Sequence, residues 1–293
     1  MCTCFKIDVT LILGLFRSLT LRTGATMLLS LFKDKNLALV GLRSLHLVLE
    51  ELEYAASTSH AEWHFAEPVL KELLVVEIAL LNAVTYADLS ITKAILRCLR
   101  VLCILKRNPA IPLPEYCSEA DYLKRYAQYE AMSTPGASVV GQAAFQKRIR
   151  KYTQSLSVAS PARSAVFRLV FQRVLEQTEN IKSKFSNANP QPSADMSRSY
   201  FQEWRNGVLY VSCAIRQNVD LESDGYLANV EDIFPKSIPL NTASALAIIK
   251  KFLHDIFSFL EVDDVIVRET AREALASELN LRALPILLET LDE

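Results

Sequence analysis

Two histidines and two cysteines in the first part of the chain are the residues whose spacing comes nearest to a metal site. His60 and His64 are four residues apart, which lets two side chains on one helical face share a zinc ion. The hydrolytic motif needs a glutamate directly after the first histidine, whereas Glu62 follows two positions later, on another face. One residue separates Cys2 from Cys4, and no second pair completes a zinc site. We therefore predict neither a metal site nor a cofactor.

A short basic segment is the strongest candidate for a binding surface. It contains four basic residues within five positions: Lys147, Arg148, Arg150 and Lys151. Such a row on a helix could contact phosphate groups, anionic lipid or an acidic protein, with Ile149 facing the core. The net charge of −1 lacks the basic excess of a nucleic-acid binder. The segment is predicted to be either a solvated helical face or a contact surface for an acidic partner, and we expect no nucleic-acid binding.

The sequence contains no recognisable catalytic motif. Glycine-rich phosphate loops and the serine nucleophile motif GxSxG are missing. The chain has only four histidines that could serve as the base of a catalytic triad. We therefore predict that the chain is not an enzyme and binds no small-molecule substrate. The six scattered cysteines are predicted to be buried, reduced thiols of a cytoplasmic protein.

Composition and periodicity predict an all-α fold of the HEAT/armadillo-like helical-repeat solenoid class. Hydrophobic residues make up 51% of the chain, and glycine occurs only 7 times, which disfavours a turn-rich strand protein. Residues 263–280 are the most informative stretch. An aspartate at 263 or 264 is placed to cap a helix, and Val267, Ala271 and Ala274 form an apolar face with small residues. This pattern is typical of the second helix of a HEAT-type repeat.

Breaks in the helical pattern divide the chain into four predicted parts. Residues 1–107 form N-terminal helical repeats, residues 115–185 form middle helices with the basic segment, residues 186–193 form a linker, and residues 194–293 form C-terminal HEAT-like repeats. The linker is small, polar and proline-bearing. An apolar run at residues 9–16 is too short to span a bilayer. We predict that the run is a buried helix and that the chain has no transmembrane segment.

The C-terminal third resembles a known family. The resemblance lies in residues 200–214, 252–260, 267–279 and 283–287. Their order and spacing are similar to the helical-repeat region of neurofibromin and the fungal Ira proteins, which are Ras GTPase-activating proteins. The matching positions are Glu203, Trp204, Asn206, Arg268, Glu278 and Leu279. The chain departs from the family at Gly207-Val208-Leu209, where many members have Thr-Gly-Phe, and at Ala276, where members have glycine.

The resemblance implies a role in the negative regulation of Ras signalling. In that family an arginine finger lies in a separate catalytic domain downstream, so this chain is expected to be a non-catalytic scaffold segment. The implied partners are the GAP catalytic module and a second copy of the chain, in the cytoplasm or peripherally at membranes. The alternative is an unrelated HEAT/armadillo-type adaptor, such as a transport or morphogenesis scaffold.

Overall fold

The computed structural model describes residues 35–58, 67–85, 89–105, 119–133, 142–155, 161–186, 198–215 and 242–292. Within these ranges the regular structure is helical, and no strand occurs. The predicted all-α helical-repeat fold is therefore confirmed. Several predictions fall outside the described residues, namely those for Cys2 and Cys4, for His60 and His64, for the apolar run at 9–16 and for residues 187–193 of the linker.

The described ranges contain ten α-helices and three short turns of other helical types. The α-helices are α3 (Lys35–Thr58), α4 (Glu67–Val84), α5 (Leu89–Leu105), α6 (Glu119–Ser133), α7 (Gln142–Ser155), α8 (Pro161–Ser186), α9 (Arg198–Ala214), α11 (Thr242–Ser258), α12 (Val265–Glu273) and α13 (Leu284–Asp292). The short turns are the 3₁₀ turns η1 (Phe259–Glu261) and η3 (Leu281–Ala283) and the π-helical turn η2 (Ala274–Glu278).

Local sequence explains where two of these helices begin. Helix α8 starts at Pro161, which suits the first helical position because proline lacks the N–H that would be unsatisfied there. Helix α12 starts after Asp264, whose carboxylate accepts hydrogen bonds from the backbone N–H groups of Ile266 and Val267 at 2.9 and 3.1 Å. Asp264 is thus the N-cap, one of the two capping residues that the sequence suggested.

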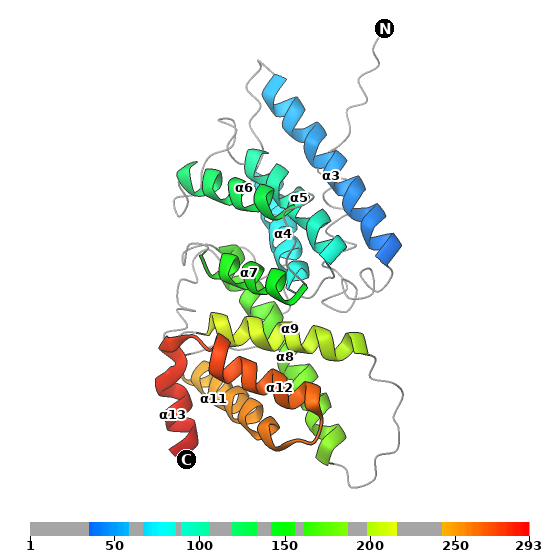
Figure 1. Ribbon diagram of the computed structural model, residues 1–293. Coiled ribbons are helices and arrows are strands. Elements are labelled where there is room, and N and C mark those ends of the chain that lie inside the picture. The colour runs from blue at the N-terminus through cyan, green and yellow to red at the C-terminus, as the bar shows by residue number, and fades with distance from the viewer. Residues whose placement is uncertain are drawn as a thin grey trace.

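The helices form one continuous stack. Helices α3 to α6 occupy one end, α11 to α13 the other, and α7 to α9 lie between them (Figure 1). The buried apolar side chains make a single cluster with members from every one of these helices. The predicted N-terminal, middle and C-terminal parts therefore share one hydrophobic core.

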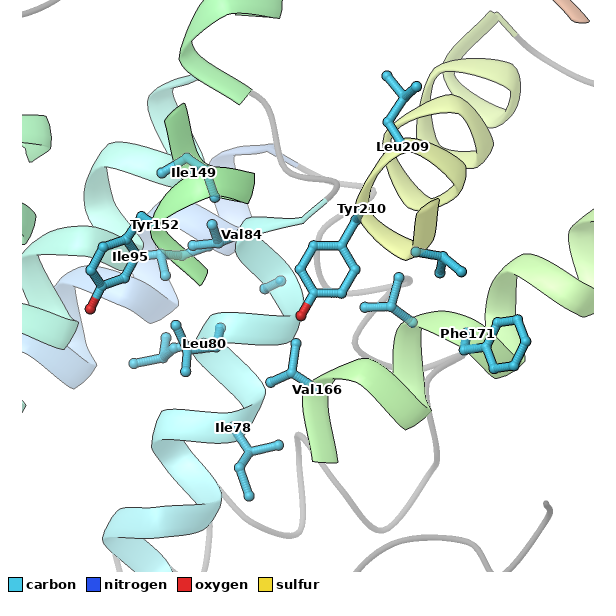
Figure 2. Packing of buried hydrophobic residues seen from close by; sticks show 14 of the residues in the cluster. Ile78, Leu80, Val84, Ile95, Ile149, Tyr152, Val166, Phe171, Leu209 and Tyr210 are labelled. Atoms are coloured by element: carbon cyan, nitrogen blue, oxygen red, sulfur yellow. The ribbon is translucent and has the colours of Figure 1, made fainter. Parts of the chain in front are cut away.

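Helix α8 connects the two ends of the stack. It packs against α4 on one side and α9 on the other, and Figure 2 shows Tyr210 of α9 directed toward Val166 of α8 and the neighbouring turns of α4. Arg173 of α8 is buried and donates to Asn82 Oδ1 at 3.4 Å and to Thr85 Oγ1 at 3.1 Å. A cation at the C-terminal end of α4 is favoured by the helix dipole, so this contact helps to hold α8 on α4.

A second polar contact lies inside the N-terminal group of helices. Arg125 of α6 pairs with Glu77 of α4 at 3.4 Å, and both side chains are almost fully buried. Nearby, the rings of Tyr129 and Tyr152 meet edge to face with centroids 5.0 Å apart. Burial raises the pKa of Tyr129 well above its usual value. Its phenol therefore stays neutral, and the side chain is part of the hydrophobic core.

Gly207 allows α9 to approach α8 closely, and its replacement by alanine is expected to destabilise the protein. A Cβ atom at this position would lie 2.6 Å from Val174 Cγ2. Overpacking of this kind costs about 1–3 kcal/mol, more than the gain of about 0.5–1 kcal/mol in helix propensity. Chemical denaturation should therefore give a lower free energy of unfolding for Gly207→Ala.

Two control variants separate the steric cost from helix propensity. Gly41→Ala on α3 adds a Cβ with nothing within 4 Å, so it should stabilise the protein by about 0.5–1 kcal/mol. In a Val174→Ala background the clash is removed, and Gly207→Ala should no longer be destabilising. Equal effects of Gly207→Ala in the two backgrounds would contradict the close approach.

Candidate interaction site

Helix α7 carries the predicted basic segment and is amphipathic. Phe145 and Ile149 are buried with 1% of their surface exposed, as the sequence predicted for Ile149. Arg148 and Lys151 are exposed, and Lys147 is half-exposed, with 46% of its side chain accessible. Three of the four predicted basic residues thus lie on the outer surface of α7.

The prediction that Arg150 belongs to this basic surface is wrong. Only 4% of its side chain is exposed, and its guanidinium forms a two-pronged ion pair with Glu278, which is equally buried. Arg150 Nη2 lies 3.1 Å from Glu278 Oε1, and Nε lies 3.4 Å from Oε2. Lys147 Nζ also reaches Oε1, at 3.2 Å. The acidic partner of these two basic residues belongs to the same chain and connects α7 to η2.

Trp204 and Asn206, which carry part of the family resemblance, lie inside the fold. Trp204 is fully buried, donates from Nε1 to Thr178 Oγ1 at 3.0 Å, and packs edge to face on Phe259 with ring centroids 5.7 Å apart. Asn206 is also buried, and its Oδ1 accepts from Gln202 Nε2 at 3.1 Å. Trp204 therefore joins α9 to α8 and η1.

Other residues of the resemblance connect or shape the neighbouring elements. Arg268 of α12 donates from Nη1 to the Val262 carbonyl at 3.1 Å. Leu279 is partly buried against the core, and Glu203 is partly buried on α9. Next to Trp204, Arg205 pairs with Glu273 of α12 at 2.6 Å. Among the positions that match the family, Trp204 thus joins α9 to α8 and η1, and Glu278 joins η2 to α7.

Asn280 has a structural role that the sequence did not suggest. Its backbone N–H donates to the Ser212 carbonyl at 3.0 Å, and its Nδ2 donates to the Cys213 carbonyl at 3.3 Å. The last carbonyls of a helix have no partner within the helix. Asn280 therefore supplies donors to the C-terminal end of α9 from a segment far away in the sequence. Its Oδ1 also accepts from the Arg282 N–H at 3.0 Å.

The burial of Glu278 could have been predicted from its spacing from apolar residues of the same segment. It follows Ala274 by four positions and Ala271 by seven, and both alanines are fully buried. Residues at these spacings share one face of a helix. A carboxylate on an apolar face needs a charged or hydrogen-bonding partner, but nothing in the local pattern shows that Arg150 is that partner.

The described cysteines are buried free thiols. Cys98, Cys103 and Cys213 are all buried, as predicted. Burial raises the pKa of Cys98 and of Cys213 to about 12, and at Cys213 the nearby Glu278 carboxylate adds to the effect. Because the thiolate is the reactive form, Cys98 and Cys213 stay protonated and inert at neutral pH.

In the described part of the chain, no group of three or more histidine, cysteine or carboxylate side chains is arranged to hold a metal ion. None of the helices in these ranges combines the length and the apolarity needed to cross a lipid bilayer.

Comparison with known proteins identifies no relative. No family model matches the chain, and no curated protein and no solved structure matches it significantly. The site must therefore be interpreted from its own geometry. That geometry consists of a buried ion pair that fixes α7 on η2 and an outer row of three positive charges at Lys147, Arg148 and Lys151.

Proposed function

We propose that the chain is a non-catalytic helical scaffold that binds other proteins, and that it serves as the scaffold segment of a Ras GTPase-activating protein. The observation that carries the scaffold role is the pairing of charged residues between α7 and η2 and between α9 and α12. Arg150, Glu278, Arg205 and Glu273 all form ion pairs between helices. These groups connect separate elements of the stack, which supports a scaffold role.

The Ras assignment is supported by the resemblance of residues 200–291 to the family. A scaffold in such a protein leaves GTP hydrolysis to a separate module with an arginine finger. On this proposal the exposed charges of Arg148 and Lys151 contact an acidic surface of that module or anionic lipid, and the protein works in the cytoplasm or at the membrane surface.

A second candidate is an unrelated helical-repeat adaptor. It is favoured by the roles of Trp204 and Asn206, which are buried between helices and would be useful in any array of packed helices. Such an adaptor would have the same basic row on α7 and the same stacked core, but no relation to Ras.

Binding to a Ras-GAP catalytic module distinguishes these two proposals, and single-turnover GTP hydrolysis by Ras tests the non-catalytic assignment. We expect the chain alone to leave the hydrolysis rate unchanged, and we expect it to bind an isolated Ras-GAP catalytic module in a titration at low salt. Arg148→Glu combined with Lys151→Glu should weaken that binding, whereas the matched surface changes Arg43→Glu and Arg97→Glu should not. Arg43 and Arg97 are exposed on α3 and α5.

Each outcome has a defined meaning. Acceleration of hydrolysis by the chain alone would overturn the non-catalytic assignment. Absence of binding to the catalytic module at every salt concentration would overturn the Ras assignment and favour the unrelated adaptor.

A further inference from the structure

The outer face of helix α7 carries three positive charges, at Lys147, Arg148 and Lys151, called here the basic row. The helix itself contains no acidic residue, and no described residue forms an ion pair with Arg148 or Lys151. Like charges four positions apart, such as Lys147 and Lys151, repel each other and weaken a helix. An anionic partner would relieve this repulsion, and the row is therefore a surface for an anion.

The contacts of Glu278 show that this part of α7 accepts a carboxylate. Its Oε1 lies 3.1 Å from Arg150 Nη2 and 3.2 Å from Lys147 Nζ, and its Oε2 lies 3.4 Å from Arg150 Nε. Two cations thus share one carboxylate. Arg150 is only 4% exposed and makes two contacts, so it neutralises Glu278 by itself. Lys147 is the surplus cation of the group.

Lys147 can leave Glu278 at little cost. Because 46% of its side chain is exposed, its ion pair is partly solvated, and such pairs contribute little to stability. After its departure Glu278 keeps both contacts with Arg150. An external carboxylate that binds Lys147 therefore leaves no unpaired charge in the interior.

The side chains around the basic row favour a polypeptide over a lipid surface. The large apolar residues of α7, which are Phe145, Ile149 and Tyr152, are buried, and Figure 2 shows Ile149 and Tyr152 within the cluster of core residues. The apolar residues that α7 exposes are the small Ala143 and Ala144. A helix that lies in a membrane surface needs large apolar side chains to insert. An acidic polypeptide needs only the charges and a free approach, which the alanines allow.

We propose that the basic row binds a carboxylate-rich segment of a partner protein, and that Lys147 exchanges Glu278 for a carboxylate of that partner. The inference rests on the proposed scaffold role and deepens it, because it names the chemistry of the partner and the residue that changes its contact. Arg148 and Lys151 are available in the free chain, whereas Lys147 joins them only on binding. Glu278 thus competes with the partner for one of the three charges.

Titration of the full chain with a labelled oligoglutamate peptide tests the proposal. Fluorescence anisotropy at low salt should show binding, and added salt should weaken it. Lys147→Gln, Arg148→Gln and Lys151→Gln should each raise the dissociation constant by about two- to fivefold, the range of exposed ion pairs. Arg43→Gln removes an exposed charge from α3 and is the matched control, which should bind like the wild type. Circular dichroism and melting temperature establish that each variant is folded.

The variants separate the exchange from simple binding to the row. If Lys147→Gln binds like the wild type while Arg148→Gln is weakened, Lys147 stays on Glu278 and the exchange is wrong. A wild-type chain that does not bind the peptide at low salt, or variants of the row that all bind it equally well, would overturn the surface itself.

A lipid arm tests the class of partner. Vesicles of phosphatidylserine and phosphatidylcholine should bind the chain more weakly than the peptide does, and tighter binding to the vesicles would overturn the choice of a polypeptide. Neither probe contains Ras or a GAP module. The basic row can therefore be confirmed where the Ras assignment fails, and a GAP module that binds through another surface would leave the Ras assignment standing where the row fails.

Discussion

Replacement of Glu278 by alanine is expected to lower the free energy of unfolding by about 3–5 kcal/mol. The change leaves the Arg150 guanidinium, only 4% exposed, without its anionic partner in the interior. An unpaired buried charge is far more costly than an unpaired exposed one. The loss can be measured by urea denaturation monitored by circular dichroism. Lys147→Ala is the control, because 46% of that side chain is exposed and its pair should contribute less than about 1 kcal/mol.

Removal of both charges should be much less harmful than removal of one. In Arg150→Met combined with Glu278→Leu, apolar side chains of similar volume occupy the same space, and buried ion pairs replaced in this way often lose little or no stability. The double variant should therefore be more stable than Glu278→Ala. If Glu278→Ala costs no more than Lys147→Ala, the pair is not buried as described.

Trp204→Ala is the second variant for which a large loss is expected, again about 3–5 kcal/mol. The indole is fully buried between α8, α9 and η1, so truncation leaves a large cavity at a point where three elements meet. Thermal and chemical denaturation should both show the loss. Phe257→Ala, on the exposed side of α11, is the matched aromatic control and should cost less than about 1 kcal/mol.

The hydrogen bond of Trp204 can be separated from its packing by a double-mutant cycle. Trp204→Phe keeps a ring but leaves the Thr178 hydroxyl, which is buried, without its donor. Thr178→Val leaves the indole N–H without its acceptor. Each single change should cost about 1–3 kcal/mol, and the two together should cost less than their sum, because no unsatisfied group remains. Strict additivity would contradict the bond between Trp204 and Thr178.

Several features of the C-terminal third could be predicted because they depend on residues close together in the chain. The carboxylate of Asp264 caps α12 through N–H groups two and three residues ahead. Val267, Ala271 and Ala274 are all fully buried, as their helical spacing predicted. Backbone geometry over a few residues determines caps and periodicity, so a single sequence is enough to find them.

The same reasoning from local sequence wrongly predicted that Arg150 lies on the surface of α7. A row of basic residues on a helix usually lies in solvent, because an isolated buried cation is very unfavourable. The exception depends on Glu278, a residue 128 positions away. The C-terminal end of α9 is a similar case, since its donors come from Asn280, 67 positions beyond Cys213. No pattern within one helix contains this information.

Short-range geometry and composition were enough to predict the helices, an aspartate cap on α12 and the apolar face of residues 267–274. Contacts between distant segments determine which polar groups are buried in pairs and which apolar residues stay uncovered. On α13 the periodicity does not distinguish the buried Ile286 from the exposed Leu288, because both belong to apolar stripes of one helix. The choice between the two stripes is made by the elements that pack against α13, and those elements are set by contacts between distant parts of the chain.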